Sequence, residues 1–133
     1  MVNNQSISNV FFLGFRNQKE LSLIFSLASF FILASSSEPW GLVVNEALCF
    51  GLPVILSDKV ISGFDLVDHG VNGFIFPVKD HRILSQYMSI LINDRTLCRE
   101  MSNRSLERIN NFGHNQQVHG LISACQYLKS YNC

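Results

Sequence analysis

Short, uninterrupted apolar runs recur along the chain and constrain its fold more than any other feature. Each run is three or four residues long, and the runs alternate with segments whose apolar residues have helical spacing. Strands that are apolar throughout belong to sheets covered by helices on both faces. The pattern therefore predicts an α/β fold with a Rossmann-like parallel sheet and flanking helices. The four runs are Val10 to Leu13, Phe30 to Leu33, Pro53 to Leu56 and Phe74 to Phe76.

Helices are expected between and after these runs. The last two carry the C-terminal part of the chain, about residues 94–133, and one of them has an apolar stripe from Val118 to Leu128. No repeat or low-complexity linker divides the sequence, so residues 1–133 are expected to form a single partial domain. The other expected helices lie around Leu21 to Ala28, from about Gly41 to Phe50 with Gly51 as a C-terminal stop, and after Asp80 as an N-cap.

Composition excludes several classes of protein. The chain has 133 residues, 47% of them hydrophobic and 15% charged, which excludes disorder. Ten basic and ten acidic residues give no net charge, and therefore no general attraction to nucleic acid. The apolar stretch from Leu21 to Ala34 is interrupted by serines and is too short to span a bilayer. With no basic, apolar leader at the N-terminus, the sequence predicts a cytoplasmic protein.

The four cysteines (Cys49, Cys98, Cys125 and Cys133) form no CxxC pair and have no histidine at ligand spacing. This pattern favours free thiols over a metal site or a disulfide framework.

The segment from Ser35 to Ala47 is the strongest candidate site. It follows an expected strand and begins an expected helix, which is where α/β folds bind ligands. The amides of Gly41, Leu42 and Val43 would be unpaired donors that favour a phosphate. Glu38 and Glu46 could contact opposite ends of one elongated ligand. Without a ligand, Glu38 would complement the helix dipole and Glu46 would be a solvated carboxylate.

These two carboxylates, framed as Glu-Pro-Trp-Gly-Leu-Val-Val-Asn-Glu-Ala, resemble the E-x7-E signature of retaining glycosyltransferases of the GT-B fold, family 4. A lone E-x7-E is a weak signal, but the resemblance extends in family order over about residues 10 to 92. It implies a truncated C-terminal, donor-binding domain of such an enzyme. The other matching segments are Phe12 to Phe15, Leu33 to Ser36, Gly51 to Ile55, Ser57 to Asp58, Asp65 to Val67 and Gly70 to Phe74.

The resemblance also implies a role for each site residue. Glu46 would bind the ribose hydroxyls of a nucleotide diphosphate-sugar, and Glu38, the residue assigned to catalysis, would face the donor sugar. The amides of Gly41, Leu42 and Val43 would hold the sugar and the diphosphate. The leaving phosphate would serve as base toward an acceptor sugar or lipid-linked glycan. Anomeric configuration would be retained, and neither metal nor cofactor would be needed.

The sequence departs from the family in two respects. The family's diphosphate-clamping Arg and Lys precede the segment that matches Val10, whereas Met1 to Asn9 contains no basic residue. The acceptor lobe is absent, as are two strands that the family places between the runs at Val10 and Phe30. The chain must therefore pair these runs directly, expose an edge, or accept a complementary N-terminal polypeptide. The alternative function is a non-catalytic remnant or interaction module that retains the fold.

Other polar residues are weaker candidates. Asp58 is expected either to reach the cleft or to form a turn, and Asp65 to cap a short helix. Ile61 and Phe64 depart from the family's loop beside the donor pocket. Trp40 is expected to pack against the helix start, and His69 and His81 to be solvated. The arginines on this part of the chain are expected to form a solvated face; the alternatives are docking to an anionic membrane surface, peripheral at the inner membrane face, or to a partner lobe. They are Arg95, Arg99, Arg104 and Arg108, interspersed with Glu100 and Glu107.

Overall fold

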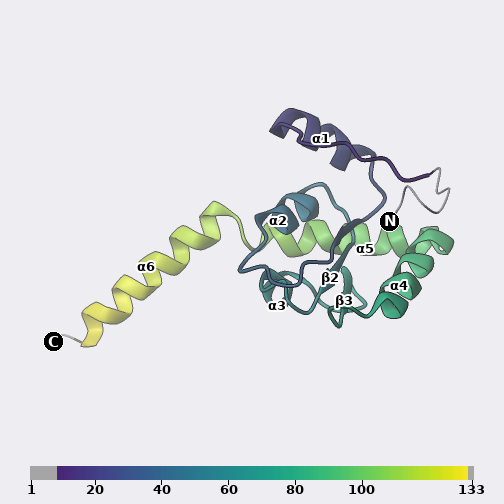
Figure 1. Cartoon of the computed structure of the whole chain (residues 1–133). Coiled ribbons are helices and arrows are strands. Elements are labelled where there is room, and N and C mark those ends of the chain that lie inside the picture. The colour runs from purple at the N-terminus through teal and green to yellow at the C-terminus, as the bar shows by residue number, and fades with distance from the viewer. Residues whose placement is uncertain (1–8, 132–133) are drawn as a thin grey trace.

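The computed structural model describes residues 9–131 and has three strands and six helices in that range. The strands follow the predicted apolar runs to within a residue, except for the first run. Figure 1 shows the sheet between helices, with the last helix extending away from the rest. The elements are α1 (Gln18–Leu27), β1 (Phe31–Leu33), α2 (Leu42–Cys49), β2 (Val54–Ser57), α3 (Ser62–Leu66), β3 (Gly73–Phe76), α4 (His81–Asn93), α5 (Arg95–Asn110) and α6 (His114–Tyr131).

The sheet is parallel with the order β1-β2-β3, and this confirms the predicted fold class. Phe31 is in register with Val54, and Val54 with Gly73. Every residue of the central strand β2 is buried. The carboxyl ends of β1 and β2 therefore meet at one edge of the sheet, where the segment containing Glu38 begins.

Helices cover both faces of the sheet, as the continuous apolar strands predict. Val54 and Leu56 pack with α1, α2 and α3 on one face, in a cluster that includes Phe25, Val44 and Leu66. The intervening Ile55 points to the other face and packs with residues of α4 and α5. Because successive strand residues alternate between faces, one apolar strand fills both clusters.

A buried hydroxyl on α5 connects this helix to the segments that lead into β2 and β3. Ser105 Oγ of α5 lies 3.0 Å from the carbonyl oxygen of Leu52 and 3.3 Å from that of Asn72. The Asn72 side chain donates to the carbonyl of Leu66 at 2.9 Å and accepts from the amide of Asp68 at 2.8 Å. These bonds hold the loop after α3 against α5.

The predicted helix caps and stops are confirmed at two positions and wrong at one. Asp80 caps α4 by accepting from the amides of Arg82 and Ile83, and Gly51 follows α2 with a φ of 69°. Asp65 caps no helix, because it lies inside α3, whose N-cap is Ile61 and has no side-chain hydrogen bond.

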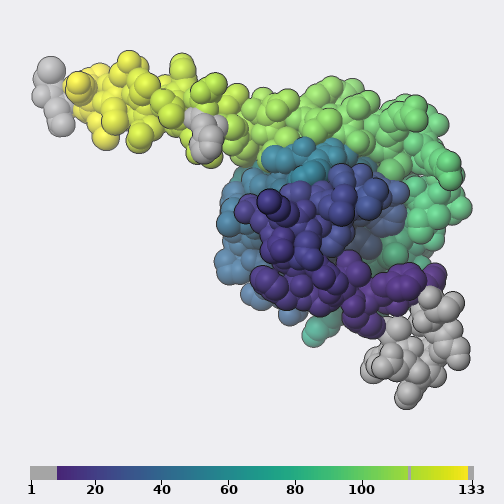
Figure 2. All heavy atoms as spheres, turned by 90° about the horizontal axis from the view of Figure 1, so that it is seen from above, coloured from purple at the N-terminus to yellow at the C-terminus, as the bar shows by residue number. Residues whose placement is uncertain are grey.

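The prediction of a strand at Val10 to Leu13 is wrong. This segment has no ladder partner, and the side chains of Phe11 and Phe12 are each 79% exposed. It lies on the surface, in purple in Figure 2. Of the alternatives that the sequence left open, the described chain shows an exposed edge: β1 pairs only with β2 there.

The apolar stripe of helix α6 is not covered by any other part of the described chain. All described side chains from 115 to 131 are exposed, among them Val118, Leu121 and Ile122. Within the described residues, no helix combines the length and apolar character needed to cross a membrane.

Candidate functional site

The start of α2 is the centre of the candidate site. Its N-cap, Gly41, has φ 82° and ψ 63°, in the left-handed region that suits glycine. The carbonyl of Gly41 accepts from the amide of Val44 at 2.8 Å. In the described part of the chain, the amides of Leu42 and Val43 have no acceptor. These free donors at a helix N-terminus favour an anionic group.

Glu38 is held in front of this helix by its backbone. Its amide donates to the carbonyl of Lys59 at 3.0 Å, and its own carbonyl accepts from the amide of Ile61 at 3.1 Å. The half-buried side chain borders a hollow of about 370 Å³. These two hydrogen bonds fix the position of the Glu38 backbone, so its carboxylate forms part of the wall of the hollow. The residues lining it are Ser36, Ser37, Glu38, Pro39, Asp58, Lys59, Ile61 and Phe64.

Glu46 lies one turn further along α2 and lines a second hollow, of about 230 Å³, between α1 and α2. Its side chain is exposed, whereas the adjacent Asn45 has a buried Oδ1 atom without a hydrogen-bond partner. Polar and apolar side chains share this hollow, which suits a ligand with both hydroxyls and a flat ring. Its residues are Gln18, Leu21, Ser22, Phe25, Asn45, Glu46, Cys49 and Phe50.

The structure places the two carboxylates in separate hollows, with the first turn of α2 between them. From Gly41 to Glu46 the helix rises about 7.5 Å, at roughly 1.5 Å per residue. Along the chain, the free amides of Leu42 and Val43 lie between the two carboxylates. The sequence analysis missed Gln18 and Ser22, although their i, i+4 spacing on α1 placed them on one face with Leu21.

The weaker candidates have mainly structural contacts. Asp58 lies in the turn that the Val60 amide closes by donating to the Ser57 carbonyl at 3.1 Å, and it also borders the Glu38 hollow. Its Oδ1 accepts from the amide of Val78, 20 residues further along the chain, at 2.9 Å. His69 Nδ1 accepts from the amide of Ile75 at 3.0 Å. Trp40 is 37% exposed and its carbonyl accepts from the amide of Ser62.

The arginine face is only partly solvated. Arg108 of α5 donates to the carbonyl of Asp65 through Nη2 at 2.6 Å and lies 3.4 Å from a carboxylate oxygen of Asp68. It thus holds the end of α3, a role that the sequence analysis missed. Arg104 and Glu107 form an exposed ion pair at 2.7 Å.

Lys59 is a cationic side chain at the Glu38 hollow that the sequence analysis also missed. Its Nζ lies 3.5 Å from a carboxylate oxygen of Asp58, and both side chains line the hollow. It lies two residues after the end of β2, where a parallel sheet gathers functional side chains. Among residues 9–131, no group of three or more His, Cys, Asp or Glu side chains could hold a metal ion.

A protein-family model described as "Glycosyl transferases group 1" matches residues 3–108. An uncharacterized glycosyltransferase of Haemophilus influenzae is 31% identical over 86 residues, which are 65% of this chain and 24% of that protein. The N-acetyl-alpha-D-glucosaminyl L-malate synthase of Bacillus anthracis is 29% identical over 110 residues, or 82% of this chain and 28% of the synthase. The chain thus spans about a quarter of the length of these curated relatives.

Solved structures show the same fold. A sucrose-phosphate synthase of Thermosynechococcus elongatus superposes with a TM-score of 0.78 at 24% identity, over 98% of this chain and 33% of that one. HepE of Anabaena, solved in complex with UDP-glucose, has a TM-score of 0.71 at 26% identity, over 92% of this chain and 35% of that one.

Proposed function

The chain belongs to the glycosyl transferases group 1 family, and on this premise we propose that it is the donor-binding part of an enzyme that transfers a sugar from a nucleotide diphosphate-sugar. The observation that carries the proposal is the first turn of α2: along the chain, its free Leu42 and Val43 amides lie between Glu38 and Glu46, and each of these carboxylates lines a hollow. A nucleotide diphosphate-sugar has matching parts: hydroxyls at both ends and negative charge between them.

Each part of this donor has a counterpart in the site. The Glu46 hollow would take the nucleoside, with the carboxylate accepting from the ribose hydroxyls. The amides at Gly41, Leu42 and Val43 would hold the diphosphate and the sugar, because charge-assisted bonds at a helix N-terminus are favourable. Glu38, in its own hollow, would face the donor sugar as the catalytic carboxylate.

The reaction we propose retains anomeric configuration and needs no metal or cofactor. The leaving phosphate would accept the proton of the acceptor hydroxyl, and the α2 amides would stabilise the charge that develops on the diphosphate. Lys59 supplies a single positive charge at the Glu38 hollow, which is too little to neutralise two phosphates. We therefore expect the chain to require a complementary polypeptide for turnover. That polypeptide would also bind the acceptor, a sugar or a lipid-linked glycan. We place the enzyme in the cytoplasm, peripheral to the inner membrane face where the acceptor is lipid-linked.

Calorimetry tests donor binding on the whole chain. UDP and UDP-glucose are the probes, because HepE was solved with UDP-glucose. Replacing Glu46 by Ala removes charged hydrogen bonds to two hydroxyls, each of about 1.5–3 kcal/mol, and should weaken binding of both probes by at least about tenfold. Glu38→Gln should weaken UDP-glucose more than UDP.

Glu107→Ala is the matched control, since Glu107 is an exposed carboxylate paired with Arg104 on α5. It should leave both affinities unchanged. The absence of heat with either probe, even when a polypeptide from the missing part of a relative is present, would refute the donor-binding proposal.

A non-catalytic interaction module is the second candidate, and the exposed aromatic side chains of Phe11, Phe12 and Phe15 favour it. Such a module would bind a partner chain and no nucleotide. Calorimetry without binding, combined with a stable complex, would therefore select it over the enzyme.

A further inference from the structure

A hollow of about 580 Å³ lies at the amino ends of β1 and β2. Phe30, which directly precedes β1, and Leu52, which lies two residues before β2, both line it. Because the strands are parallel, their amino ends lie at the edge of the sheet opposite the carboxyl ends, which the Glu38 segment follows. A hollow of this volume can hold one small-molecule ligand. It is therefore a second place where the chain could bind a ligand.

One wall of this hollow consists of hydrogen-bond donors on one face of α5. Arg95, Arg99 and Ser102 line it, and their i, i+4 and i+7 spacing places them on one face of the helix. Within residues 9–131, neither of these two guanidinium groups forms an ion pair, whereas Arg104 and Arg108 of the same helix do. Like charges four residues apart on a helix repel each other. The wall thus offers two positive charges that no described carboxylate neutralises.

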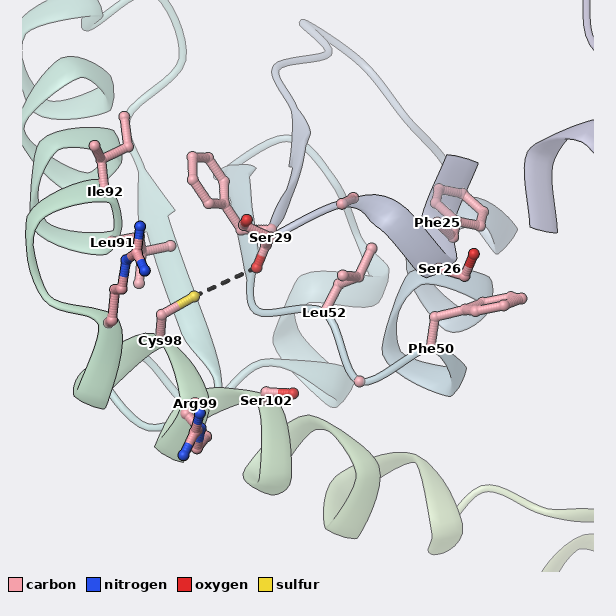
Figure 3. A pocket seen from close by; sticks show the side chains of 14 residues that line it. Phe25, Ser26, Ser29, Phe50, Leu52, Leu91, Ile92, Cys98, Arg99 and Ser102 are labelled. Atoms are coloured by element: carbon pink, nitrogen blue, oxygen red, sulfur yellow. Dashed lines mark hydrogen bonds between the residues drawn. The ribbon is translucent and has the colours of Figure 1, made fainter. Parts of the chain in front are cut away.

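Apolar side chains form the opposite wall. Phe25, Leu52 and Leu91 line the hollow and are at most 6% exposed, and Phe50 adds an aromatic ring that is partly exposed. In the view of Figure 3, Phe25 and Phe50 lie across the hollow from Arg99. A ligand that uses both walls is therefore apolar at one end and anionic at the other.

We propose that this hollow binds one phosphate monoester of an apolar alcohol. The phosphate contacts Arg95 and Arg99, with the Ser102 hydroxyl as a further donor, and the apolar chain covers Leu52 and Leu91. A phosphate monoester carries a charge of about −1.5 to −2 at pH 7, which matches two guanidinium groups better than the single charge of a carboxylate does. Guanidinium groups also bind phosphate through paired, charge-assisted hydrogen bonds.

Two cysteines distinguish this hollow from the neighbouring Glu46 hollow. Cys98 lines the hollow at the amino ends of the strands, as Figure 3 shows, and Cys49 lines the Glu46 hollow. The two hollows share Phe25 and Phe50 as wall residues. A ligand in the first hollow therefore covers Cys98, whereas a ligand in the second covers Cys49.

Calorimetry on the whole chain with octyl phosphate tests the proposal. Inorganic phosphate and 1-octanol each lack one half of this probe, and octyl phosphate should bind at least about tenfold more tightly than either. Each buried methylene contributes about fourfold, so octyl phosphate should also bind at least about fivefold more tightly than hexyl phosphate. Octyl phosphate should slow the modification of Cys98 by iodoacetamide and leave that of Cys49 unchanged.

The source of the monoester is identified with vesicles of phosphatidylcholine that contain phosphatidic acid. Protection of Cys98 by octyl phosphate and by these vesicles assigns the ligand to a lipid. Protection by octyl phosphate alone assigns it to a dissolved compound.

Arg99→Ala and Arg82→Ala are matched variants. Both arginines are exposed and form no ion pair within the described chain, but Arg82 on α4 does not line the hollow. Arg99→Ala should weaken binding of octyl phosphate about tenfold, and Arg82→Ala should not. Equal effects of the two variants, equal affinities for octyl phosphate and 1-octanol, or protection of Cys49 in place of Cys98 would each overturn the proposal. UDP affinity is measured separately, so donor binding and monoester binding can fail independently.

Discussion

Replacing Gly41 by Ala perturbs the start of α2 and the position of Glu38 together. At φ 82°, an alanine is in the left-handed region, which costs about 1–2 kcal/mol. The new Cβ would also lie 3.1 Å from Glu38 Cγ, 3.3 Å from Leu33 Cδ2 and 3.4 Å from Val60 Cγ1. The first two distances are shorter than ordinary contacts, so these side chains must move apart.

Gly70→Ala separates backbone strain from crowding. Gly70 has the same φ of 82°, but nothing lies within 4 Å of a Cβ built there. Any change in the unfolded chain is shared by the two variants and cancels in their difference. We expect Gly70→Ala to cost about 1–2 kcal/mol. Gly41→Ala should cost about 2–4 kcal/mol, since overpacking adds about 1–3 kcal/mol.

Urea unfolding and thermal melts measure these costs. At about 3–5 °C per kcal/mol for a domain of this size, Gly41→Ala should melt several degrees below Gly70→Ala. Displacement of Glu38 should also weaken UDP-glucose relative to UDP in Gly41→Ala and leave Gly70→Ala unchanged. If the two variants have equal stability and equal affinity ratios, the close packing of Gly41 against Glu38 does not exist in solution.

Three further predictions concern the scaffold. Ser105→Ala should lower the free energy of unfolding by about 1–3 kcal/mol, because its buried hydroxyl lies 3.0 Å from the Leu52 carbonyl; urea unfolding measures this. Asp80→Ala should cost about 0.5–2 kcal/mol through loss of the α4 cap, seen as a lower melting temperature by circular dichroism. Burial raises the pKa of the Cys98 thiol, so iodoacetamide should modify it more slowly at pH 8 than the exposed Cys49, as mass spectrometry would measure.

Each of these has its own control. Ser130→Ala removes an exposed hydroxyl on α6 and should change stability by less than about 0.5 kcal/mol. Asp80→Asn keeps a capping oxygen and should retain most of the stability. The raised pKa means that the folded state favours protonated Cys98, so its contribution to stability should be fully present below the thiol's ordinary pKa of 9.0 and be lost as pH rises from there through the raised pKa. Equal alkylation of Cys98 and Cys49 would contradict this.

The helices could be predicted because their signals are local. Asp80 caps α4 and Gly51 follows α2 through contacts within a few residues, and the sequence contains all of the groups involved. The hollows could not be predicted in the same way. The Glu46 hollow depends on how α1 packs against α2, and the Glu38 hollow on how Lys59 and Ile61 hold the loop. These contacts join residues that are distant in sequence, so composition and spacing do not determine them.

The two apolar runs at Val10 and Phe30 show why a strand is less predictable than a helix. Both are four residues of nearly the same composition, yet Phe31 to Leu33 forms β1 and Val10 to Leu13 forms no strand. The difference is the neighbour: β2 supplies hydrogen-bond partners to Phe31, and nothing in the described chain supplies them to Phe11. Strand composition is therefore a preference for pairing, which is realised only where a neighbouring strand supplies the hydrogen-bond partners.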